Sequence, residues 1–384
     1  MRFEFATAGR VLFGPDAVKE IATIVRDLGK RVLIVRGSNP DRSRALEAML
    51  GAAKIDCFPF EVHGEPTIER IEEGATQARR ADADVVIGFG GGSVIDSAKA
   101  IAALVTNPEP ILEYLEVIGK GKQLNIPSLP CVAIPTTAGT GAEVTRNSVL
   151  ASQEHRVKVS LRSPYLLPRF AIVDPKLTSD LPPSMTASTG LDALTQLIEP
   201  YVCTRSNPIT DGLCVEGMRR AARSLRRAYE AGEDLSARED MSLASLFGGF
   251  ALANAGLGAV HGFAAPIGGM FHAPHGAVCA ALLPHVMEIN VRAMRQRAAD
   301  NPVLGRYDSI AAILTGSGKA TSTDAIQWIT ELCAELNVPG LRNYGIAETD
   351  IPSLVEKAAK ASSMKANPIL LTTEELAEAL HRAL

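Results

Sequence analysis

The sequence predicts an α/β domain followed by an all-α domain, and two observations carry this prediction. Before residue 180, short apolar runs alternate with helical segments, a pattern typical of a parallel sheet with helices on both faces. After Asp180-Leu181-Pro182-Pro183 the pattern is helical, rich in Ala and Leu, with little clustering of β-branched residues. We therefore expect domains over residues 1–180 and 181–384.

Each element follows from the hydrophobic periodicity of its segment. The expected strands are residues 31–35, 57–62, 85–87, 131–134 and 171–173. Two helices are expected among them, 16–28 and 68–80, and hairpin signals are few. In the second domain the clearest helices are 187–201, 209–230, 237–253 and 372–384.

Composition narrows the class of protein. The 384 residues suffice for two hydrophobic cores, and 46% hydrophobic with 21% charged residues is ordinary for a globular protein. The net charge of -4 gives no basic bias toward nucleic acid or anionic lipid. We find no signal peptide and expect no membrane-spanning stretch. Six scattered cysteines without a CxxC pair predict reduced, mostly buried thiols in a cytoplasmic protein, and neither disulfides nor a zinc cluster.

A glycine-rich turn between an apolar strand and a helical segment is the strongest functional signal. The run 85–87 leads into Gly90-Gly91-Gly92-Ser93, and Asp96 and Lys99 follow. Glycine lets a backbone pass close to a phosphate, and the free N–H groups and dipole of the helix start attract that anion. We predict that a nucleotide pyrophosphate binds here, although a tight turn without a ligand would use the same residues.

A second loop follows the next apolar strand. It reads Thr136-Thr137-Ala138-Gly139-Thr140-Gly141, with Glu143 just beyond. Such hydroxyls and backbone N–H groups can wrap a polar ligand. An ordinary Thr/Gly turn is the alternative, and the nearby glycine-rich turn favours the ligand.

Candidate metal ligands gather in the helical half. Asp192 and Gln196 are four residues apart, so they share a helix face and both offer oxygens. His261, His272 and His275 fall in one short segment that Pro266, Gly268, Gly269 and Pro274 are expected to break into two helical ends. One Asp and two His suit Zn²⁺ or Fe²⁺ with an open position. The alternatives are a helix-capping or ion-paired Asp and ordinary packed histidines.

These motifs, in this order, resemble the iron-containing (group III) alcohol dehydrogenase family. The likeness covers essentially the whole chain, through segments 11–15, 90–99, 136–143, 174–175, 189–194, 261–275 and 367–368. The resemblance implies a Rossmann-like N-terminal domain, a helical C-terminal domain of the dehydroquinate synthase-like architecture, and a deep cleft between them. It also implies NAD(P)-dependent interconversion of an alcohol with an aldehyde or ketone.

Carried over residue by residue, the resemblance implies two sets of site residues. The coenzyme set is Gly37, Ser38, Gly90, Gly91, Gly92, Ser93, Asp96 (which fixes the turn), Thr136, Thr137, Thr140 and Lys158. The metal set is Asp192, His261 and His275, with Gln196 at the position of a fourth ligand.

Departures from the family pattern affect the metal set first. Gln196 stands where members commonly have a histidine, and an amide oxygen is the weaker ligand, so the site could hold zinc, hold iron weakly, or hold no metal. Ala265 stands where many members have a proposed proton-relay histidine, and His272 could replace it.

The coenzyme set also departs from the pattern. The strand at 32–35 continues as Arg36-Gly37-Ser38-Asn39, without the Asp that often holds the adenosine ribose and repels a 2′-phosphate. The missing carboxylate and the nearby Arg36 make NADP(H) plausible, although Arg36 could equally point to solvent. Glu65 stands where members often have Asn in the coenzyme region.

Our hypothesis from the sequence is metal-assisted hydride transfer. Asp192, His261 and His275 hold a divalent ion that polarises the substrate oxygen, and His272 or a water chain handles the proton. The alternatives are a metal-independent reductase of the maleylacetate reductase type, a lyase resembling dehydroquinate synthase, and a non-catalytic nucleotide-binding protein. A small-molecule alcohol or carbonyl is the expected substrate, and a homodimer or higher homo-oligomer is the expected assembly.

Overall fold

The computed structural model describes residues 2–152, 154–155 and 157–384, which form two compact units. The first, the α/β unit, comprises Ala6–Thr137 and Gly141–Thr178. The second, the helical unit, comprises Ser179–Leu384 together with residues 2–5 and Ala138–Thr140. Three residues of the loop after the fifth strand therefore belong to the helical unit.

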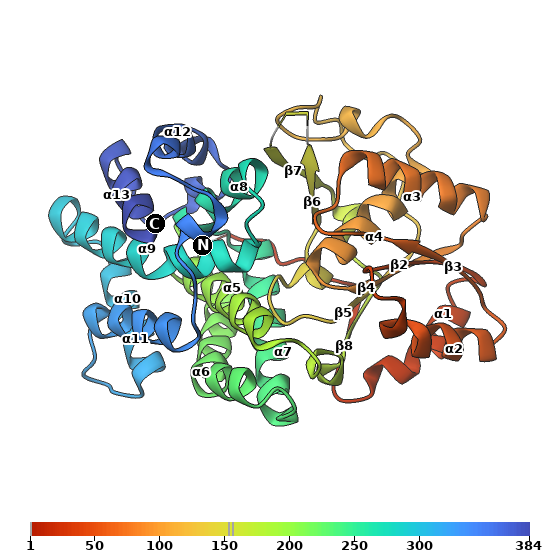
Figure 1. Cartoon of the computed structure of the whole chain (residues 1–384), viewed down its shortest axis with the longest axis horizontal. Coiled ribbons are helices and arrows are strands. Elements are labelled where there is room, and N and C mark those ends of the chain that lie inside the picture. Colours follow the sequence, from red (N-terminus) through yellow and green to blue (C-terminus); the bar gives the residue numbers. More distant parts are fainter. Residues whose placement is uncertain (1, 153, 156) are drawn as a thin grey trace. The chain divides into compact units, whose positions relative to one another are not determined.

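The α/β unit is built on a six-stranded parallel sheet. Its strands, in the order β1-β8-β5-β4-β2-β3, are β1 (Arg10–Phe13), β8 (Phe170–Val173), β5 (Cys131–Pro135), β4 (Val85–Gly90), β2 (Arg31–Arg36) and β3 (Asp56–Glu61). The connecting helices are α1 (Ile21–Arg26), α2 (Arg44–Ala52), α3 (Ile68–Arg80) and α4 (Gly92–Thr106) (Figure 1). The expected strands are all present, and α3 has the expected bounds.

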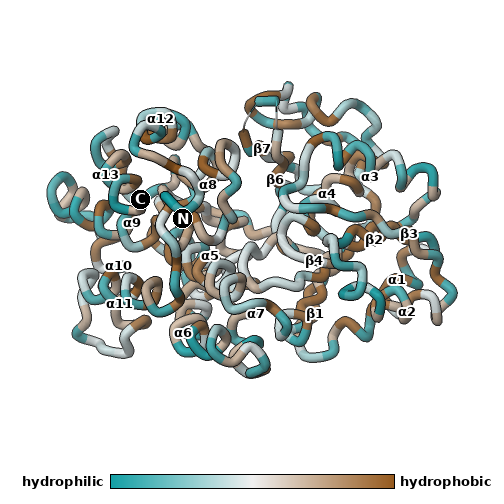
Figure 2. Tube along the Cα trace, in the orientation of Figure 1, coloured by the Kyte–Doolittle hydropathy of each residue, from teal (hydrophilic) through white to brown (hydrophobic). Residues whose placement is uncertain are grey.

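Side-chain alternation along the strands gives each face of the sheet its own core. On β2, Leu33 and Val35 pack in the cluster that includes α3 and α4. Val32 and Ile34 point the other way, into the cluster that includes α1 and α2. Figure 2 shows the hydrophobic colouring concentrated along the strands. The helix expected at 16–28 is shorter, because its first turn is the 3₁₀ helix Ala17–Glu20.

The strand order places a topological switch point beside β2. The chain runs from β2 to β3 on one side and then returns to place β4 on the other side of β2. In open parallel sheets, ligands bind outside the carboxyl ends of the strands at such a point. The residues after β2 and β4 are therefore the ones to inspect for a coenzyme.

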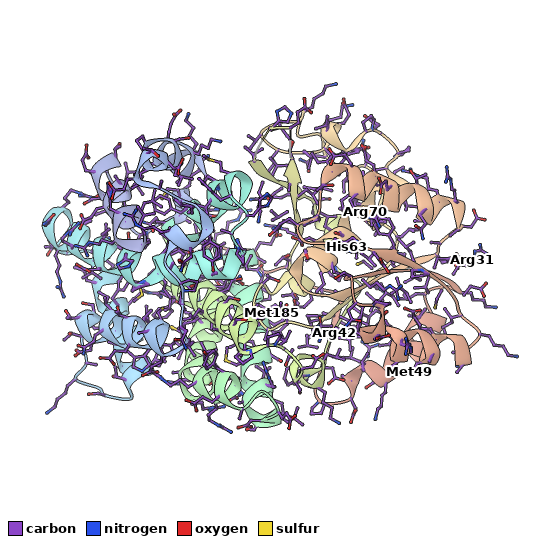
Figure 3. The ribbon with its side chains drawn as sticks, viewed as in Figure 1. Arg31, Arg42, Met49, His63, Arg70 and Met185 are labelled. Carbon is purple, nitrogen blue, oxygen red and sulfur yellow. The ribbon has the colours of Figure 1, made fainter. Side chains whose placement is uncertain are left out.

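Two arginines fix the outer strands of this sheet (Figure 3). Arg31 lies over the Phe58 ring and donates to the carbonyl of Ala81 at 2.7 Å. Arg70 lies 3.9 Å from the centre of the Phe60 ring and donates to the carbonyl of Glu61. Arg31 thus links the end of α3 to β2 and β3, and Arg70 links the start of α3 to β3.

One hairpin in the α/β unit was missed by the sequence analysis. β6 (Asn147–Ser152) and β7 (Val157–Arg162) form a two-stranded antiparallel sheet. Its inward positions on β6 are Ser148, Leu150 and Ser152, so two of three are polar and no hydrophobic alternation is visible. Ser148 donates its hydroxyl to the carbonyl of Asp96 at 2.8 Å, which replaces apolar packing.

The helical unit contains nine α-helices among the residues that the structure describes. They are α5 (Pro183–Val202), α6 (Pro208–Glu230), α7 (Leu235–Asn254), α8 (Ala259–Met270), α9 (His275–Arg297), α10 (Val303–Thr315), α11 (Ser322–Glu335), α12 (Ile351–Lys360) and α13 (Thr373–Ala383). The four expected helices are present. The segment that carries the three histidines is divided into two helical ends, as expected, but the break lies at residues 271–274, and Pro266, Gly268 and Gly269 lie inside α8. Pro266 is buried, and that packing offsets the lost backbone hydrogen bond.

α9 corrects the expectation that no segment could span a membrane. It is long and apolar enough to do so by length and composition, but 83% of its most apolar window is buried inside the protein. A core helix of a large all-α unit has the same composition. We therefore assign α9 to the core of the helical unit.

Candidate functional site

The candidate metal centre is formed where α5, α8 and α9 meet. Gly276, the second residue of α9, lies against the backbone of α5, and a Cβ there would overlap the carbonyl oxygen of Ser188. The same Cβ would lie 3.4 Å from the Cβ of Asp192. This close approach brings His275, the first residue of α9, beside Asp192.

Four side chains converge at this point, and we call them the metal cluster: Asp192, His261, His275 and Cys279. Their ligand atoms all lie within 4.8 Å of one another. The Asp192 Oδ1 atom lies 3.4 Å from Nε2 of His261 and 3.8 Å from Nε2 of His275. The Cys279 Sγ atom lies 3.8 Å from each of the same two nitrogens. The two imidazole rings are tilted, with centres 5.4 Å apart.

The side chains of the metal cluster are buried to a degree that is unusual for polar groups that bind no ligand. Asp192 and His261 are almost fully buried, whereas the His275 side chain is 32% exposed and forms the open side. Neither Oδ1 of Asp192 nor Oε1 of Gln196 has a hydrogen-bond partner among the described residues, and both atoms are buried. A buried oxygen without a donor is costly, so each needs an explanation.

Glu199 orients His261 from behind and was missed by the sequence analysis. Its Oε2 atom accepts from Nδ1 of His261 at 2.6 Å, and its Oε1 atom accepts from the backbone N–H of Val260 at 2.7 Å. With Nδ1 occupied, Nε2 is the nitrogen that faces the metal cluster. A carboxylate behind a ligating histidine is the usual second partner in metal sites. Glu199 lies seven residues after Asp192, on the same face of α5, which was the available signal.

Proximity shifts the pKa values of the cluster. Burial raises the pKa of Asp192, but His275 and His261 outweigh burial and hold that pKa below its usual value. Burial lowers the pKa of His261, but Cys279, Asp192 and Glu199 raise it well above the usual value. Burial raises the pKa of the Cys279 thiol to about 12. Without a cation, protons balance these charges, and a divalent ion would take their place.

The donor set fits a divalent transition metal. Zinc takes Asp oxygen, His nitrogen and Cys sulfur at about 2.0–2.3 Å, which places tetrahedral ligand atoms about 3.3–3.6 Å apart. The separations of 3.4 to 3.8 Å across the cluster are close to that spacing. The cluster also includes a cysteine that the sequence analysis did not name as a candidate ligand, Cys279. It lies one helical turn after His275, on the same face of α9.

The remaining predicted residues of this unit lie at different depths. Gln196 is buried one turn after Asp192, packed against Gly248 of α7. His272 lies exposed in the connection between α8 and α9. Ala265 lies on α8, one turn after His261.

The glycine-rich turn lies at the switch point of the α/β unit. Gly90 ends β4, Gly91 caps α4 and Gly92 begins that helix. A Cβ on Gly90 would lie 2.7 Å from the Cβ of Val94, so this glycine is required for packing of the helix start on the strand. The first N–H groups of α4, at Gly92 and Ser93, precede the helical hydrogen-bonding pattern and are available to an anion.

The threonine loop is adjacent to the glycine-rich turn. The backbone N–H of Thr136 donates to the carbonyl of Gly90 at 2.9 Å, and a Cβ on Gly91 would lie 3.4 Å from Thr137. Farther along, Gly139 packs on Thr189 within the helical unit, which also includes Thr140. The structure thus brings Thr136 and Thr137 next to Gly90 and Gly91.

Asp96 and Lys158 both anchor the hairpin. The Asp96 carboxylate accepts from the backbone N–H of Val149 at 2.9 Å and pairs with Lys99 at 2.8 Å. Burial raises the pKa of Asp96, and Lys99 only partly offsets that effect. Lys158, on β7, pairs with Glu65 at 2.8 Å. Asp96 therefore fixes β6 to α4, beyond the turn that it was expected to fix.

Arg36, at the end of β2, is already engaged. Its guanidinium group pairs with Glu47 at 2.8 Å and with Glu61 at 3.1 Å. Gly37 follows, with open space where a Cβ would project, and Ser38 comes next. The expectation that Arg36 attracts a 2′-phosphate therefore loses its support.

A glycine-rich turn at the switch point of one unit and an Asp–His–His–Cys cluster in the other fit a dinucleotide-dependent oxidoreductase with a metal site. The sequence model described as "Iron-containing alcohol dehydrogenase" matches residues 8–175, and that of the family's C-terminal part matches residues 186–384. The chain belongs to this family and is an oxidoreductase acting on CH–OH groups.

Individual members of the family are similar to this chain over nearly its whole length. The chain is 34% identical to 1,3-propanediol dehydrogenase of Klebsiella pneumoniae, over 99% of its own length and 98% of the relative's. A crystal structure of 1,3-propanediol oxidoreductase matches with a TM-score of 0.92 at 34% identity, covering 100% of both chains. The sulfoacetaldehyde reductase of Bifidobacterium kashiwanohense, solved in complex with NAD⁺, matches with a TM-score of 0.87 at 28% identity, covering 100% of this chain and 99% of the other. The expected fold class is confirmed.

Proposed function

We propose that the chain is a metal-assisted, NAD(P)-dependent alcohol dehydrogenase that interconverts a small alcohol with its aldehyde or ketone. The observation that carries the metal-assisted part is the convergence of Asp192, His261 and His275, with the Asp192 Oδ1 atom buried and without a hydrogen-bond partner among the described residues. Relatives named as alcohol and 1,3-propanediol dehydrogenases support a small alcohol as substrate.

Each residue has a role that its surroundings support. When bound, the dinucleotide accepts or supplies the hydride, and the divalent ion polarises the oxygen of the alcohol or carbonyl. Asp192 and the two Nε2 atoms would hold the ion, and Glu199 keeps His261 in the required tautomer. His275 lies on the open side, where a substrate oxygen can approach.

The test of the metal is its removal. We expect chelated protein to lose at least 100-fold in kcat/KM for short aliphatic alcohols and to recover with one equivalent of Zn²⁺ or Fe²⁺. Asp192→Asn should abolish that recovery, whereas Asp300→Asn, at an exposed position, should not. Full activity in stripped protein, unchanged in Asp192→Asn, would contradict the metal-assisted function.

Gln196 and Ala265 favour one alternative, the metal-independent reductase of the maleylacetate reductase type. Neither residue offers an imidazole where the family commonly has one. That enzyme would act on a dicarboxylate and keep its activity in the chelated protein. Assaying stripped protein on a dicarboxylate and on a neutral aldehyde separates the two functions.

For the coenzyme, we propose that the chain accepts NAD(H) and NADP(H) with comparable efficiency. The residues after β2 offer no carboxylate against a 2′-phosphate, but Arg36 is paired with Glu47 and Glu61 and adds no attraction. The relative solved with NAD⁺ supports a nicotinamide dinucleotide.

Substitution of Ser38 tests this coenzyme proposal. We expect kcat/KM for the two coenzymes to differ by less than about tenfold. Ser38→Asp should lower kcat/KM for NADP⁺ at least tenfold and spare NAD⁺, because like charges in contact repel. Ser38→Asn, of the same shape without the charge, should leave the ratio unchanged. A strong preference in the wild type, or equal effects of both variants, would refute the assignment.

For the proton, we propose His272, since it is exposed beside the start of α9 and can exchange with solvent. His272→Gln should lower kcat about 10²–10⁴-fold and change its pH profile. His381→Gln, exposed on α13, is the matched control. An unchanged pH profile in His272→Gln would contradict this role of His272 and indicate that water exchanges the proton.

Two further proposals concern the setting of the enzyme. We propose a cytoplasmic enzyme, supported by six cysteines that are all free. We also propose a homodimer or higher homo-oligomer, the commonest arrangement for soluble proteins of this kind. Light scattering on the purified protein measures the number of chains in the oligomer.

A further inference from the structure

Cys279 places a sulfur atom in the metal cluster. It is fully buried on α9, one turn after His275. Its Sγ atom is equidistant, at 3.8 Å, from the Nε2 atoms of His261 and His275. Those are the two nitrogens that also face Asp192 Oδ1.

A hydrogen-bonding role for the thiol does not account for this symmetry. A thiol has one proton, so it can donate to only one of the two imidazole nitrogens that it faces. Nδ1 of His261 faces Oε2 of Glu199 at 2.6 Å, so Nε2 is the nitrogen of this ring that faces the cluster. Asp192 Oδ1 faces the same two nitrogens and has no hydrogen-bond partner among the described residues. A carboxylate oxygen, two imidazole nitrogens and a sulfur atom that lie within 4.8 Å of one another are a set of ligand atoms that one cation can bind.

We propose that Cys279 is a protein ligand of this metal, as a thiolate, and fills the position predicted for Gln196. The inference rests on the proposed metal site. On binding, the S–H bond breaks, a sulfur–metal bond forms and the proton leaves to solvent, so no oxidant or reductant is needed. The Gln196 side chain instead packs against Gly248 on α7.

A thiolate changes which metal the site prefers. Soft sulfur ligands favour zinc over the metals that prefer oxygen ligands, such as Mn²⁺ and Mg²⁺. A second anionic ligand beside Asp192 also neutralises the divalent charge. The cluster of this chain is therefore a zinc-selective site of mixed Asp, His and Cys ligands.

Substitution of cobalt for zinc detects a bond between the Cys279 sulfur and the metal directly. Co²⁺ added to chelator-treated, full-length protein should give a thiolate-to-cobalt charge-transfer band in the near ultraviolet at one equivalent. Cys279→Ser should bind Co²⁺ without that band, and Gln196→Ala should keep it. Cys214→Ser, a fully buried cysteine on α6 of the same unit, is the matched control and should keep it too.

Metal affinities give a second readout that does not depend on turnover. We expect Cys279→Ser to weaken Zn²⁺ at least tenfold and to weaken Mn²⁺ much less. Equal losses for both metals would indicate a merely structural change and overturn the proposal. Circular dichroism checks that each variant is folded. If a variant does not fold, the charge-transfer band of the Co²⁺-loaded wild type still tests the proposal.

The outcomes separate this proposal from the function on which it rests. Co²⁺ bound at one equivalent without a charge-transfer band would overturn ligation by Cys279 and leave the metal-assisted function standing. The same holds if the band survives in Cys279→Ser. No binding of Co²⁺ or Zn²⁺ by the wild type, with full activity after chelation, would overturn both.

Discussion

Glu199 decides how His261 presents its ring nitrogens. One carboxylate accepts from Nδ1 of His261 and from the backbone N–H of Val260, near the start of α8. A Cβ on Gly258 would lie 2.8 Å from Oε1 of Glu199, so the glycine allows this close approach. The negative charge also suits the positive end of the helix. Both effects hold the imidazole in one orientation before any ion binds.

We therefore expect Glu199→Gln to weaken Zn²⁺ binding about 10–100-fold, the usual effect of removing an orienting partner. The amide can still accept a hydrogen bond, so the fold should persist. Isothermal titration of stripped protein measures the loss. Glu288→Gln, on α9, removes a surface ion pair with Arg382 of α13 and should leave the affinity unchanged; an equal loss there would contradict this role of Glu199.

At the scale of elements, the contact between α5 and α9 depends on one glycine. Because a Cβ on Gly276 would overlap the Ser188 carbonyl, Gly276→Ala should push the start of α9 away from α5. We expect a stability loss of about 1–3 kcal/mol and weaker zinc binding, since His275 and Cys279 move with the helix. Gly212→Ala, in α6 with open space around its Cβ, should be neutral or stabilising by about 1 kcal/mol. Urea unfolding and zinc titration compare the two.

Glu143, in the segment after the threonine loop, predicts a pH dependence of the α/β unit. Burial raises the pKa of this carboxyl from 4.5 to about 7, and Lys99 only partly offsets the effect. Between those values the folded state holds a proton that the unfolded state has lost. Stability therefore falls as pH rises from about 4.5 to about 7, by about 3 kcal/mol, and is level above that range.

Replacing Glu143 removes that slope. We expect Glu143→Gln to be more stable than the wild type at pH 8 and to match it near pH 4.5. Unfolding followed at several pH values measures the difference between the two proteins. Glu109→Gln, at an exposed position, should keep the wild-type slope. A constant difference between wild type and Glu143→Gln across the range would refute the assignment.

At the scale of the whole molecule, the two candidate sites lie in different units. The glycine-rich turn belongs to the α/β unit, and the metal cluster belongs to the helical unit. A ligand stabilises the elements that it contacts, by about 4 kcal/mol at 1,000 times its Kd. Each ligand should therefore slow amide exchange first in its own unit.

Hydrogen exchange tests whether the coenzyme and the metal bind in different units. NAD⁺ should protect the start of α4 and Thr136–Thr137, whereas Zn²⁺ should protect α5, α8 and α9. Asp192→Asn should lose the zinc response and keep the NAD⁺ response. Zinc protection confined to the α/β unit would show that the ion binds elsewhere.

Much of the fold could be predicted because it depends on local patterns. The strands of the parallel sheet and α3 follow from apolar runs and helical spacing, which the chain encodes within a few residues. The β6–β7 hairpin was missed because polar Ser148 and Ser152 occupy inward positions and bond to neighbours. Pro266 was predicted to break a helix, but it lies inside α8, because tertiary packing outweighs the local preference of proline.

The sequence by itself determined which residue types were available: a glycine-rich turn after a strand, an Asp and Gln one turn apart, and histidines around Pro274. Only the tertiary structure decided which of them meet. It joined Cys279 and Glu199 to the cluster, tied Arg36 to Glu47, and left His272 exposed. The physical reason is that local periodicity fixes the face on which a side chain lies, whereas convergence depends on how α5, α8 and α9 pack across long sequence separations.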